Sequence, residues 1–336
     1  MKKHRFKVAM DDYLFGDFSI EEREFKKVNY QLVAAQCKTE DEMIALAKDA
    51  DGILNHTQPI PAKVIRALKK CKVIVRCAIG TDNIDLEAAT KKGIYVCNVP
   101  DYCVEEVSDQ ALALILSCAR KIVRYFDIVK EGYWDVGRGV PLYRLRGKVL
   151  GLVGFGRIAR RLVEKVKPWG MRIISYTRHP TEERAKRYGV EFVDFKTLLK
   201  ESDFISIHLP LTSKTKGMFG IEEFKQMKNT AFLINTSRGA VVKDEALYTA
   251  LKEGWIAGAG LDVFEGEPIE GEPLRGDVPL VHLPNVIITP HTGWYSEESL
   301  IELREKAVKE IIRVLEGSHP QFLVNPEVLK LSLIHI

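Results

Sequence analysis

The sequence predicts an α/β protein with two doubly wound domains. Apolar segments of strand length alternate with amphipathic segments along the chain, which is typical of parallel sheets covered by helices. The alternation occurs in two sets, and a glycine-rich turn from strand to helix at Gly154 opens the second set. The length of 336 residues is enough for two domains with separate cores.

The first set of elements ends near Cys103. Thr39 and Glu42 have the spacing of a capping box, and Pro61 suits the start of a helix. The predicted strands are Phe6–Met10, Gln31–Ala35, Gly52–Asn55 and Val73–Cys77, and the predicted helices are Ser19–Val28, Thr39–Ala47 and Pro61–Leu68. After this set, residues 104–131 are predicted to form one long helix between the domains, with acids early and bases late.

Residues 148–159 read KVLGLVGFGRIA, a buried strand followed by a glycine turn and a helix start. Gly154 permits the tight turn, Gly156 lets the backbone approach a pyrophosphate, and the small Ala159 allows close packing of the helix on the strand. The free N–H groups at the helix start favour phosphate. We therefore predict that Gly154, Gly156, Arg157 and Ile158 bind a dinucleotide.

The second set completes a nucleotide-binding domain of the Rossmann type. Its predicted strands are Val149–Val153, Arg172–Tyr176, Phe204–His208, Ala231–Asn235, Ala257–Asp262 and Val286–Thr289. The final long helix, Ser296–Glu316, is expected to return to the first set. We predict a Rossmann domain at residues 104–295, inserted in a discontinuous substrate-binding domain at residues 1–103 and 296–336.

Composition argues against several classes of partner. The formal charge of +4 is spread without a basic block, so neither nucleic acid nor an anionic membrane is expected as a partner. The six cysteines form no C-x-x-C pair and lie mostly in apolar runs, which favours reduced core thiols, a cytoplasmic location and no metal site. Asp11 and Asp12 interrupt the only apolar stretch near the start that a signal peptide would need.

Three motifs with reactive side chains follow predicted strands of the second set. Arg238 lies in N-T-S-R-G, Asp262 and Glu267 lie in D-V-F-E-G-E-P, and His291 lies in T-P-H. Ligands of open α/β sheets bind outside the carboxyl ends of the strands, where all three motifs are expected. A loop arginine there can hold a carboxylate, and a histidine beside a carboxylate can exchange a proton near neutral pH.

Each residue alone also fits an ordinary structural role. Arg238 could be a surface arginine, Glu267 a solvated loop acid, and His291 a histidine at the end of a strand. The three together favour a catalytic site over these separate explanations.

The order of these motifs resembles the D-isomer-specific 2-hydroxyacid dehydrogenases. Segments 82–85, 97–100 and 291–297 are most similar to the C-terminal-binding-protein branch of that family. The resemblance implies a flavodoxin-like substrate domain, a cleft between the domains, homodimers formed through the nucleotide-binding domains, and reduction of a small 2-oxo acid to a D-2-hydroxy acid. It implies that Arg238 binds the substrate, that His291 is the general acid/base, and that Glu267 assists His291.

The resemblance implies further contacts. Backbone N–H groups of Ala78, Ile79 and Gly80 would hold the substrate carboxylate. Apart from the resemblance, Trp294 lies next to the proposed catalytic histidine and could narrow the substrate pocket, although an aromatic side chain there also fits ordinary packing. Asp262 would meet the nicotinamide carboxamide. The other residues predicted to contact the cofactor are Thr177, Arg178, His208, Pro210 and Thr236.

One departure from the family concerns the cofactor. Members that use NAD usually carry an acid at the end of the second strand, where this chain has Thr177, Arg178 and His179. Thr177 lies 18 residues after Ala159, near the spacing of about 20 for that acid. Arg178 can pair with a 2′-phosphate, so NADP(H) is favoured over NAD(H), unless Glu182 or Glu183 reaches the ribose instead.

The same motifs also occur in proteins with a second kind of function. Proteins of the C-terminal-binding-protein branch act as corepressors and keep the catalytic-looking residues. The same motifs therefore also allow a nucleotide-sensing binding protein, and turnover of 2-oxo acids would distinguish the two.

Overall fold

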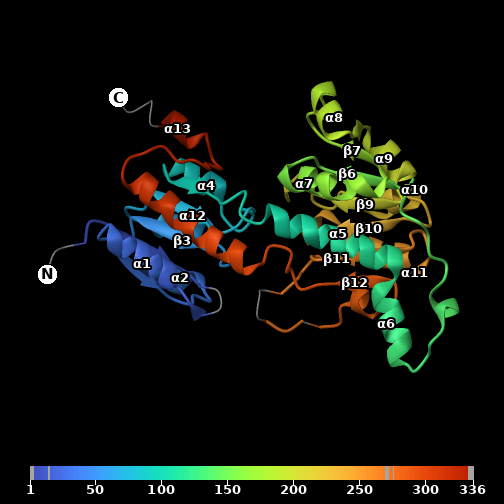
Figure 1. The fold of residues 1–336 in the computed structure, drawn as a ribbon. Coiled ribbons are helices and arrows are strands. Elements are labelled where there is room, and N and C mark those ends of the chain that lie inside the picture. Colours follow the sequence, from blue (N-terminus) through green and yellow to red (C-terminus); the bar gives the residue numbers. More distant parts are fainter. Residues whose placement is uncertain (1–3, 14–15, 269–271, 275, 332–336) are drawn as a thin grey trace. The chain divides into compact units, whose positions relative to one another are not determined.

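In the computed structural model, which describes residues 4–13, 16–268, 272–274 and 276–331, the chain folds into two compact units. Unit 1 comprises residues 1–102 and 296–336, and unit 2 comprises residues 103–295. Each unit has a parallel sheet covered by helices (Figure 1). The predicted α/β fold with two parallel sheets is therefore confirmed.

The sheet of unit 1 has the order β2-β1-β3-β4-β5, which is the flavodoxin-like order. Helices α1 and α12 pack together, and α12 also packs on β3 and β4. The elements of unit 1 are β1 (Lys7–Met10), α1 (Ser19–Lys27), β2 (Gln31–Ala34), α2 (Glu40–Ala47), β3 (Gly52–Asn55), α3 (Ala62–Ala67), β4 (Val73–Arg76), α4 (Leu86–Lys91), β5 (Tyr95–Cys97), α12 (Glu297–Leu315) and α13 (Val328–Leu331).

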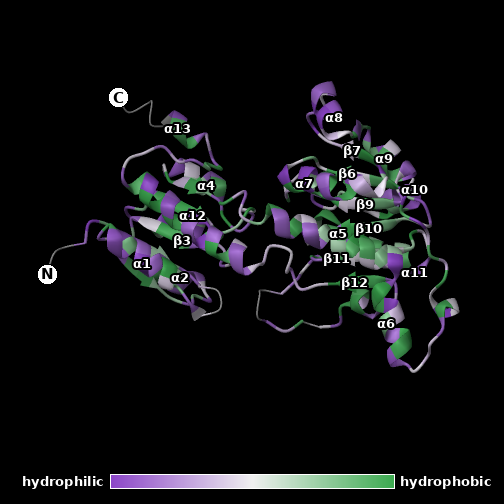
Figure 2. Ribbon diagram, in the orientation of Figure 1, coloured by the Kyte–Doolittle hydropathy of each residue, from purple (hydrophilic) through white to green (hydrophobic). Residues whose placement is uncertain are grey.

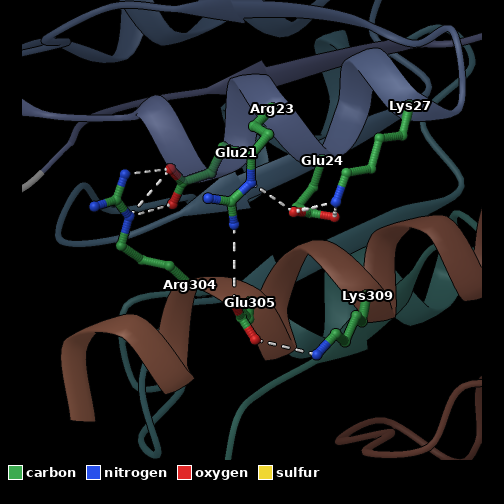
Figure 3. A network of polar contacts seen from close by, with 7 residues as sticks. All are labelled: Glu21, Arg23, Glu24, Lys27, Arg304, Glu305 and Lys309. Atoms are coloured by element: carbon green, nitrogen blue, oxygen red, sulfur yellow. Dashed lines mark hydrogen bonds and ion pairs between the residues drawn. The ribbon is translucent and has the colours of Figure 1, made fainter. Parts of the chain in front are cut away.

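A buried ion pair joins α1 and α12, two helices of unit 1 that lie far apart in the sequence. Arg304 of α12 donates three hydrogen bonds of 2.6 to 3.1 Å to the carboxylate of Glu21 on α1 (Figure 3). Exposed pairs extend the network along both helices. The segment after residue 295 is thus held against the first helix of the chain.

The sheet of unit 2 has the order β12-β11-β10-β9-β6-β7-β8. Helices α5 and α7 contribute to the core on one face, and α9, α10 and α11 contribute to the core on the other. The elements of unit 2 are α5 (Val104–Arg120), α6 (Ile122–Lys130), η2 (Val136–Gly139), β6 (Val149–Val153), α7 (Arg157–Val166), η3 (Lys167–Trp169), β7 (Arg172–Tyr176), α8 (Glu182–Tyr188), β8 (Glu191–Phe192), α9 (Phe195–Glu201), β9 (Phe204–Ile207), α10 (Ile221–Gln226), β10 (Phe232–Asn235), η4 (Gly239–Val241), α11 (Asp244–Lys252), β11 (Gly258–Leu261), η5 (Pro279–His282) and β12 (Val286–Ile288). Figure 2 shows hydrophobic residues along the strands and hydrophilic residues over outer helices such as α8.

The predicted helix over residues 104–131 is wrong in one respect. The chain breaks it at Lys121, which adopts a left-handed conformation with φ of 51° and ends α5. No glycine or proline marks this position, so the apolar period continues across it and gives no stop signal. The short strands β5 and β8 were also not predicted, because two or three residues carry no measurable alternation.

The six cysteines are buried and form no disulfide. Burial raises the pKa of the Cys71 and Cys118 thiols to about 12, so both stay protonated and behave as small apolar side chains. Among the described residues, no helix is long and apolar enough to cross a membrane.

Candidate active site

Three neighbouring strands of unit 2 carry the reactive motifs to one edge of the sheet. Asn235 of β10 lies opposite Leu261 of β11, and Leu261 lies opposite Ile288 of β12. Because these strands are parallel and in register, the loops that follow them leave the sheet side by side. These loops contain Arg238, Glu267 and His291.

The structure brings His291 and Glu267 into direct contact. Nδ1 of His291 lies 2.8 Å from Oε1 of Glu267. An ionised carboxylate only accepts hydrogen bonds, so Nδ1 carries the proton and Nε2 is left for another partner. The side chains are 42% and 30% exposed, so a small molecule can reach this pair. The pair has the geometry of a general acid held in place by a carboxylate.

The backbone of His291 is strained, with a φ of 52°. Its N–H group donates to the carbonyl oxygen of Asp262 at 2.9 Å. The buried carboxylate of Asp262 accepts further bonds from Thr289 Oγ1, from the N–H and hydroxyl of Thr292, and from the N–H of Gly293. Asp262 thus fixes the His291 loop, and its predicted contact with the nicotinamide stays a prediction.

Asn235 shapes the loop that carries Arg238. Its Nδ2 donates to the carbonyl oxygen of Arg238 at 3.0 Å, and its Oδ1 accepts from the N–H and hydroxyl of Ser237. The guanidinium of Arg238 is partly buried and donates to the carbonyl oxygen of Ser237 at 2.7 Å. The sequence analysis did not predict that the Asn235 side chain holds this turn. An asparagine at the end of a strand is, however, a residue that commonly bonds the backbone two residues further on.

The glycine turn after β6 fits a dinucleotide. Gly154 has a φ of 100°, and a β-carbon there would stand 2.4 Å from the carbonyl oxygen of His208, so only glycine fits. No side chain caps the start of α7 at Gly156, and a β-carbon at Gly156 would meet nothing within 4 Å. Open space in front of uncapped N–H groups is what a pyrophosphate needs.

Two more predicted cofactor residues lie at the ends of the neighbouring strands β9 and β10. The Oγ1 of Thr236 is buried and has no hydrogen-bond partner in the part of the chain that the structure describes, so a bound molecule can supply one. Burial lowers the pKa of His208 to about 4, which keeps its ring neutral, and Nε2 lies 2.9 Å from Ser206 Oγ. Pro210 is exposed, and its carbonyl oxygen accepts from Thr215.

The loop after β7 contains the residues predicted to select the cofactor. Thr177 is partly buried and Arg178 is exposed, and neither side chain makes a polar contact within the described residues. Arg184 of α8, which sequence reasoning missed, donates to the carbonyl oxygens of His179 and Phe155 at 2.5 and 2.9 Å. Arg184 therefore joins this loop to the glycine turn. No motif marks it, because it lies in a charged helical run.

In unit 1, Ala78, Ile79 and Gly80 follow β4. The carbonyl oxygen of Ala78 accepts from the N–H of Val99 at 3.1 Å, and that of Ile79 accepts from Asn98 Nδ2 at 2.6 Å. Their own N–H groups form no hydrogen bond to any described residue. Three unused donors on an anchored loop suit an anionic group such as a carboxylate.

Trp294 belongs to unit 2, three residues after His291. It is partly buried and packs edge-to-face on Tyr295 with a centroid distance of 5.4 Å.

Across the described chain, no group of three or more His, Cys, Asp or Glu side chains is placed to hold a metal ion.

The chain is similar to known proteins over most of its length. Residues 112–293 match the family described as D-isomer specific 2-hydroxyacid dehydrogenase, NAD binding domain. A glyoxylate reductase of Korarchaeum cryptofilum is 44% identical over 292 residues, which is 86% of each chain. A glyoxylate reductase of Thermococcus litoralis is 47% identical over 283 residues, which is 82% of this chain and 83% of that one. A crystal structure of a D-lactate dehydrogenase from Aquifex aeolicus with NAD and lactic acid has a TM-score of 0.83 and 30% identity, covering 96% and 97% of the two chains.

Proposed function

Because this chain belongs to the D-isomer-specific 2-hydroxyacid dehydrogenase family, we propose that its substrate is glyoxylate or a 2-oxo acid with a similarly short side chain. The protein is an oxidoreductase that reduces a 2-oxo acid with NAD(P)H. Support for a short substrate comes from the glyoxylate reductases, at 44 and 47% identity. The bulky Trp294 close to His291 in the sequence favours the same choice. The corepressor alternative has no support among these relatives, and the similarity to the C-terminal-binding-protein branch stays a prediction.

The proposed mechanism assigns one task to each reactive side chain. Arg238 binds the substrate with its planar fork of donors. A nicotinamide cofactor, when bound, would supply the hydride for the reduction. His291 donates the proton from Nε2 to the carbonyl oxygen, while Glu267 holds Nδ1 and favours the charged ring. The N–H groups of Ala78, Ile79 and Gly80 are proposed to bind the substrate carboxylate. The observation that carries this proposal is the contact of 2.8 Å between His291 and Glu267.

The preferred cofactor is proposed to be NADP(H). No acid occupies the end of β7, and the guanidinium of Arg178 is exposed and makes no polar contact with the described residues. Glu182 and Glu183 lie in the first turn of α8, where their negative charges interact favourably with the dipole of that helix. We assign them this structural part instead of a contact with the ribose.

We propose a homodimer formed through an apolar surface on unit 2. Trp134 is 94% exposed and Phe126 is 61% exposed. Helix α6 also carries hydrophobic residues although it leads away from the sheet of unit 2 (Figures 1 and 2). We call residues 122–143 the arm, and its exposed hydrophobic side chains the arm surface. These side chains are Ile122, Val123, Phe126, Val129, Tyr133, Trp134, Val136, Val140 and Tyr143. Exposed hydrophobic side chains concentrated in one short segment, residues 122–143, are typical of an interface between subunits.

Sedimentation velocity tests the dimer. Phe126→Glu with Trp134→Glu should convert the protein to monomers, because the change places two charges in the proposed interface. Ile301→Glu is the matched control, since Ile301 is 49% exposed but lies on α12. A dimer that survives the double change would exclude the arm surface as the interface.

Steady-state turnover tests the reaction. The protein should reduce glyoxylate and hydroxypyruvate with NADPH, and kcat/KM for glyoxylate should exceed that for a branched 2-oxo acid by about tenfold or more, the discrimination of a tight apolar pocket. Preference for the branched acid would contradict the proposed substrate size, and no turnover with any acid would contradict the reaction itself.

A further inference from the structure

We infer that Asp244 is a positioning residue for the pair of His291 and Glu267, and that its charge sets the pH range over which His291 donates its proton. Asp244 lies outside the motifs that suggested the reaction and has no predicted contact with substrate or cofactor. The inference rests on the proposed function, because it assigns Asp244 a part in that reaction.

Asp244 holds one peptide group of the loop after β11. It opens α11, and its Oδ2 accepts the N–H of Glu265 at 3.0 Å. Gly239 packs against the same peptide, since a β-carbon on Gly239 would stand 2.7 Å from the Glu265 nitrogen. The peptide between Phe264 and Glu265 is therefore fixed by residues of the segment that follows Arg238.

This peptide is two residues away from the proposed catalytic pair. The N–H of Glu267 lies 3.4 Å from the carbonyl oxygen of Phe264, which closes a turn, and the Glu267 carboxylate lies 2.8 Å from His291. A change at Asp244 thus reaches the imidazole ring through a short chain of contacts. Misplacement of a reacting group by about 1 Å can cost about 100-fold in rate, so the anchor matters for turnover.

The charge of Asp244 changes near neutral pH. Burial raises its pKa to about 7, the N–H of Glu265 opposes that shift, and the carboxylates of Glu265 and Glu267 add to it. The causes of this shift do not include the other charged residues of α11, the residue that precedes it, or the charged residues of α10 and η5, which pack against α11, namely Glu245, Lys252, Lys243, Glu222, Glu223, Lys225 and His282. The charges of Asp244 and Glu267 therefore repel each other.

The repulsion between Asp244 and Glu267 also bears on the pH dependence of the reaction. Above about pH 7 an ionised Asp244 adds a negative charge close to Glu267. Because a negative charge opposes the loss of a proton nearby, we expect reduction to persist to higher pH than it would without Asp244. Removal of the charge should shift the loss of activity to lower pH.

Two substitutions separate position from charge. Asp244→Asn keeps an oxygen that can accept the Glu265 N–H but removes the charge, and Asp244→Ala removes both. Glu245→Gln is the matched control, because Glu245 is an exposed carboxylate on the same first helical turn. Each protein is followed by the pH profile of kcat/KM, by the NMR titration of the His291 ring in the cofactor-free protein, and by fluorescence titration with NADPH.

The Asn variant should keep kcat at acidic pH within about twofold of the parent, while the basic limb of the profile and the NMR midpoint move down by about half a pH unit, the effect of one charge several ångströms away. The Ala variant should lose about tenfold or more in kcat with unchanged NADPH affinity. An Asn variant with the parental NMR midpoint, or an Ala variant with parental kcat, would overturn the inference. The NMR titration needs no turnover, so failure of the proposed reaction is distinguishable from failure of this inference.

Discussion

Gly239 lies so close to Phe264 that a β-carbon on Gly239 would stand 2.0 Å from the carbonyl carbon of Phe264. No side chain fits at this position, because the obstacle is backbone and cannot rotate away. The contact joins the loop that carries Arg238 to the loop that carries Glu267. The glycine of the N-T-S-R-G motif therefore serves close packing between two loops.

Gly239→Ala should separate these loops and lower kcat by about 100-fold. A displacement of the reacting groups by about 1 Å can reduce the reaction rate by about that factor. Affinity for NADPH, measured by fluorescence titration, should change little. The control is Gly220→Ala, where a β-carbon would meet nothing closer than 3.4 Å. Parental kcat in the Gly239→Ala protein would show that the close approach is not needed for catalysis.

The pair of His291 and Glu267 predicts a distinct pH dependence. His291→Ala should lower kcat by about 10²- to 10⁴-fold with nearly unchanged cofactor affinity, because it removes the proton donor. Glu267→Gln keeps an acceptor for Nδ1 but removes the charge that favours the protonated ring, so reduction should fail at lower pH than in the parent. Near-normal turnover of the Ala variant would exclude His291 as the acid.

Breaking the buried ion pair between Arg304 and Glu21 should destabilise unit 1. Arg304→Met leaves the buried Glu21 carboxylate unpaired, and breaking such a pair costs about 3–5 kcal/mol. Glu21→Gln with Arg304→Met should recover part of this loss, since neither charge then remains. Urea unfolding measures both proteins, and an Arg304→Met protein with the parental midpoint would contradict the expected cost.

Asp17 also bonds Arg304, and this hydrogen bond is the main cause that lowers the Asp17 pKa to about 2. A carboxyl group whose pKa is lower in the folded state stabilises that state at pH values above the pKa of the unfolded state. This contribution is lost as the pH falls toward the pKa of the folded state. Acid unfolding between about pH 4 and 2 should therefore become less steep in Asp17→Asn. The contribution is small, because the Asp17 side chain is 54% exposed.

Local signals in the sequence were enough to predict much of this fold. The turn at Gly154 and the capping box at Thr39 and Glu42 are present as predicted, because both depend on residues that are near one another in the chain. Ligands of open α/β sheets bind at the carboxyl ends of the strands, and this rule correctly predicted that the loops of Glu267 and His291 leave the same edge of a sheet.

Features that depend on the three-dimensional arrangement could not be predicted in this way. Arg184 reaches two carbonyl oxygens only because α8 is oriented over the glycine turn. Asp244 acquires its raised pKa only by burial beside a loop about twenty residues further along the chain. Lys121 ends a helix without any residue that favours a left-handed conformation. Hydrophobic periodicity contains no information about these contacts.

The loop after β7 should favour NADP(H) over NAD(H). An acid at the end of β7 would bond the ribose hydroxyls and repel a 2′-phosphate, whereas this chain has Thr177 and the exposed Arg178 there. Arg178 can form a charge-assisted pair with that phosphate, so the parent should have the higher kcat/KM with NADPH. Thr177→Asp with Arg178→Ala should reverse the preference toward NADH, because it adds the repulsive charge and removes the attractive one.

The measurement is kcat/KM for both cofactors in the parent and in the double variant. Arg184→Lys is a useful comparison, since Arg184 bonds both flanking loops through their carbonyl oxygens and a lysine cannot make the same pair of contacts. That change should weaken both cofactors together, because it loosens the loops without altering the charge beside the ribose. A parent that prefers NADH by tenfold or more, or a double variant whose preference does not move toward NADH, would show that the loop after β7 does not select the cofactor.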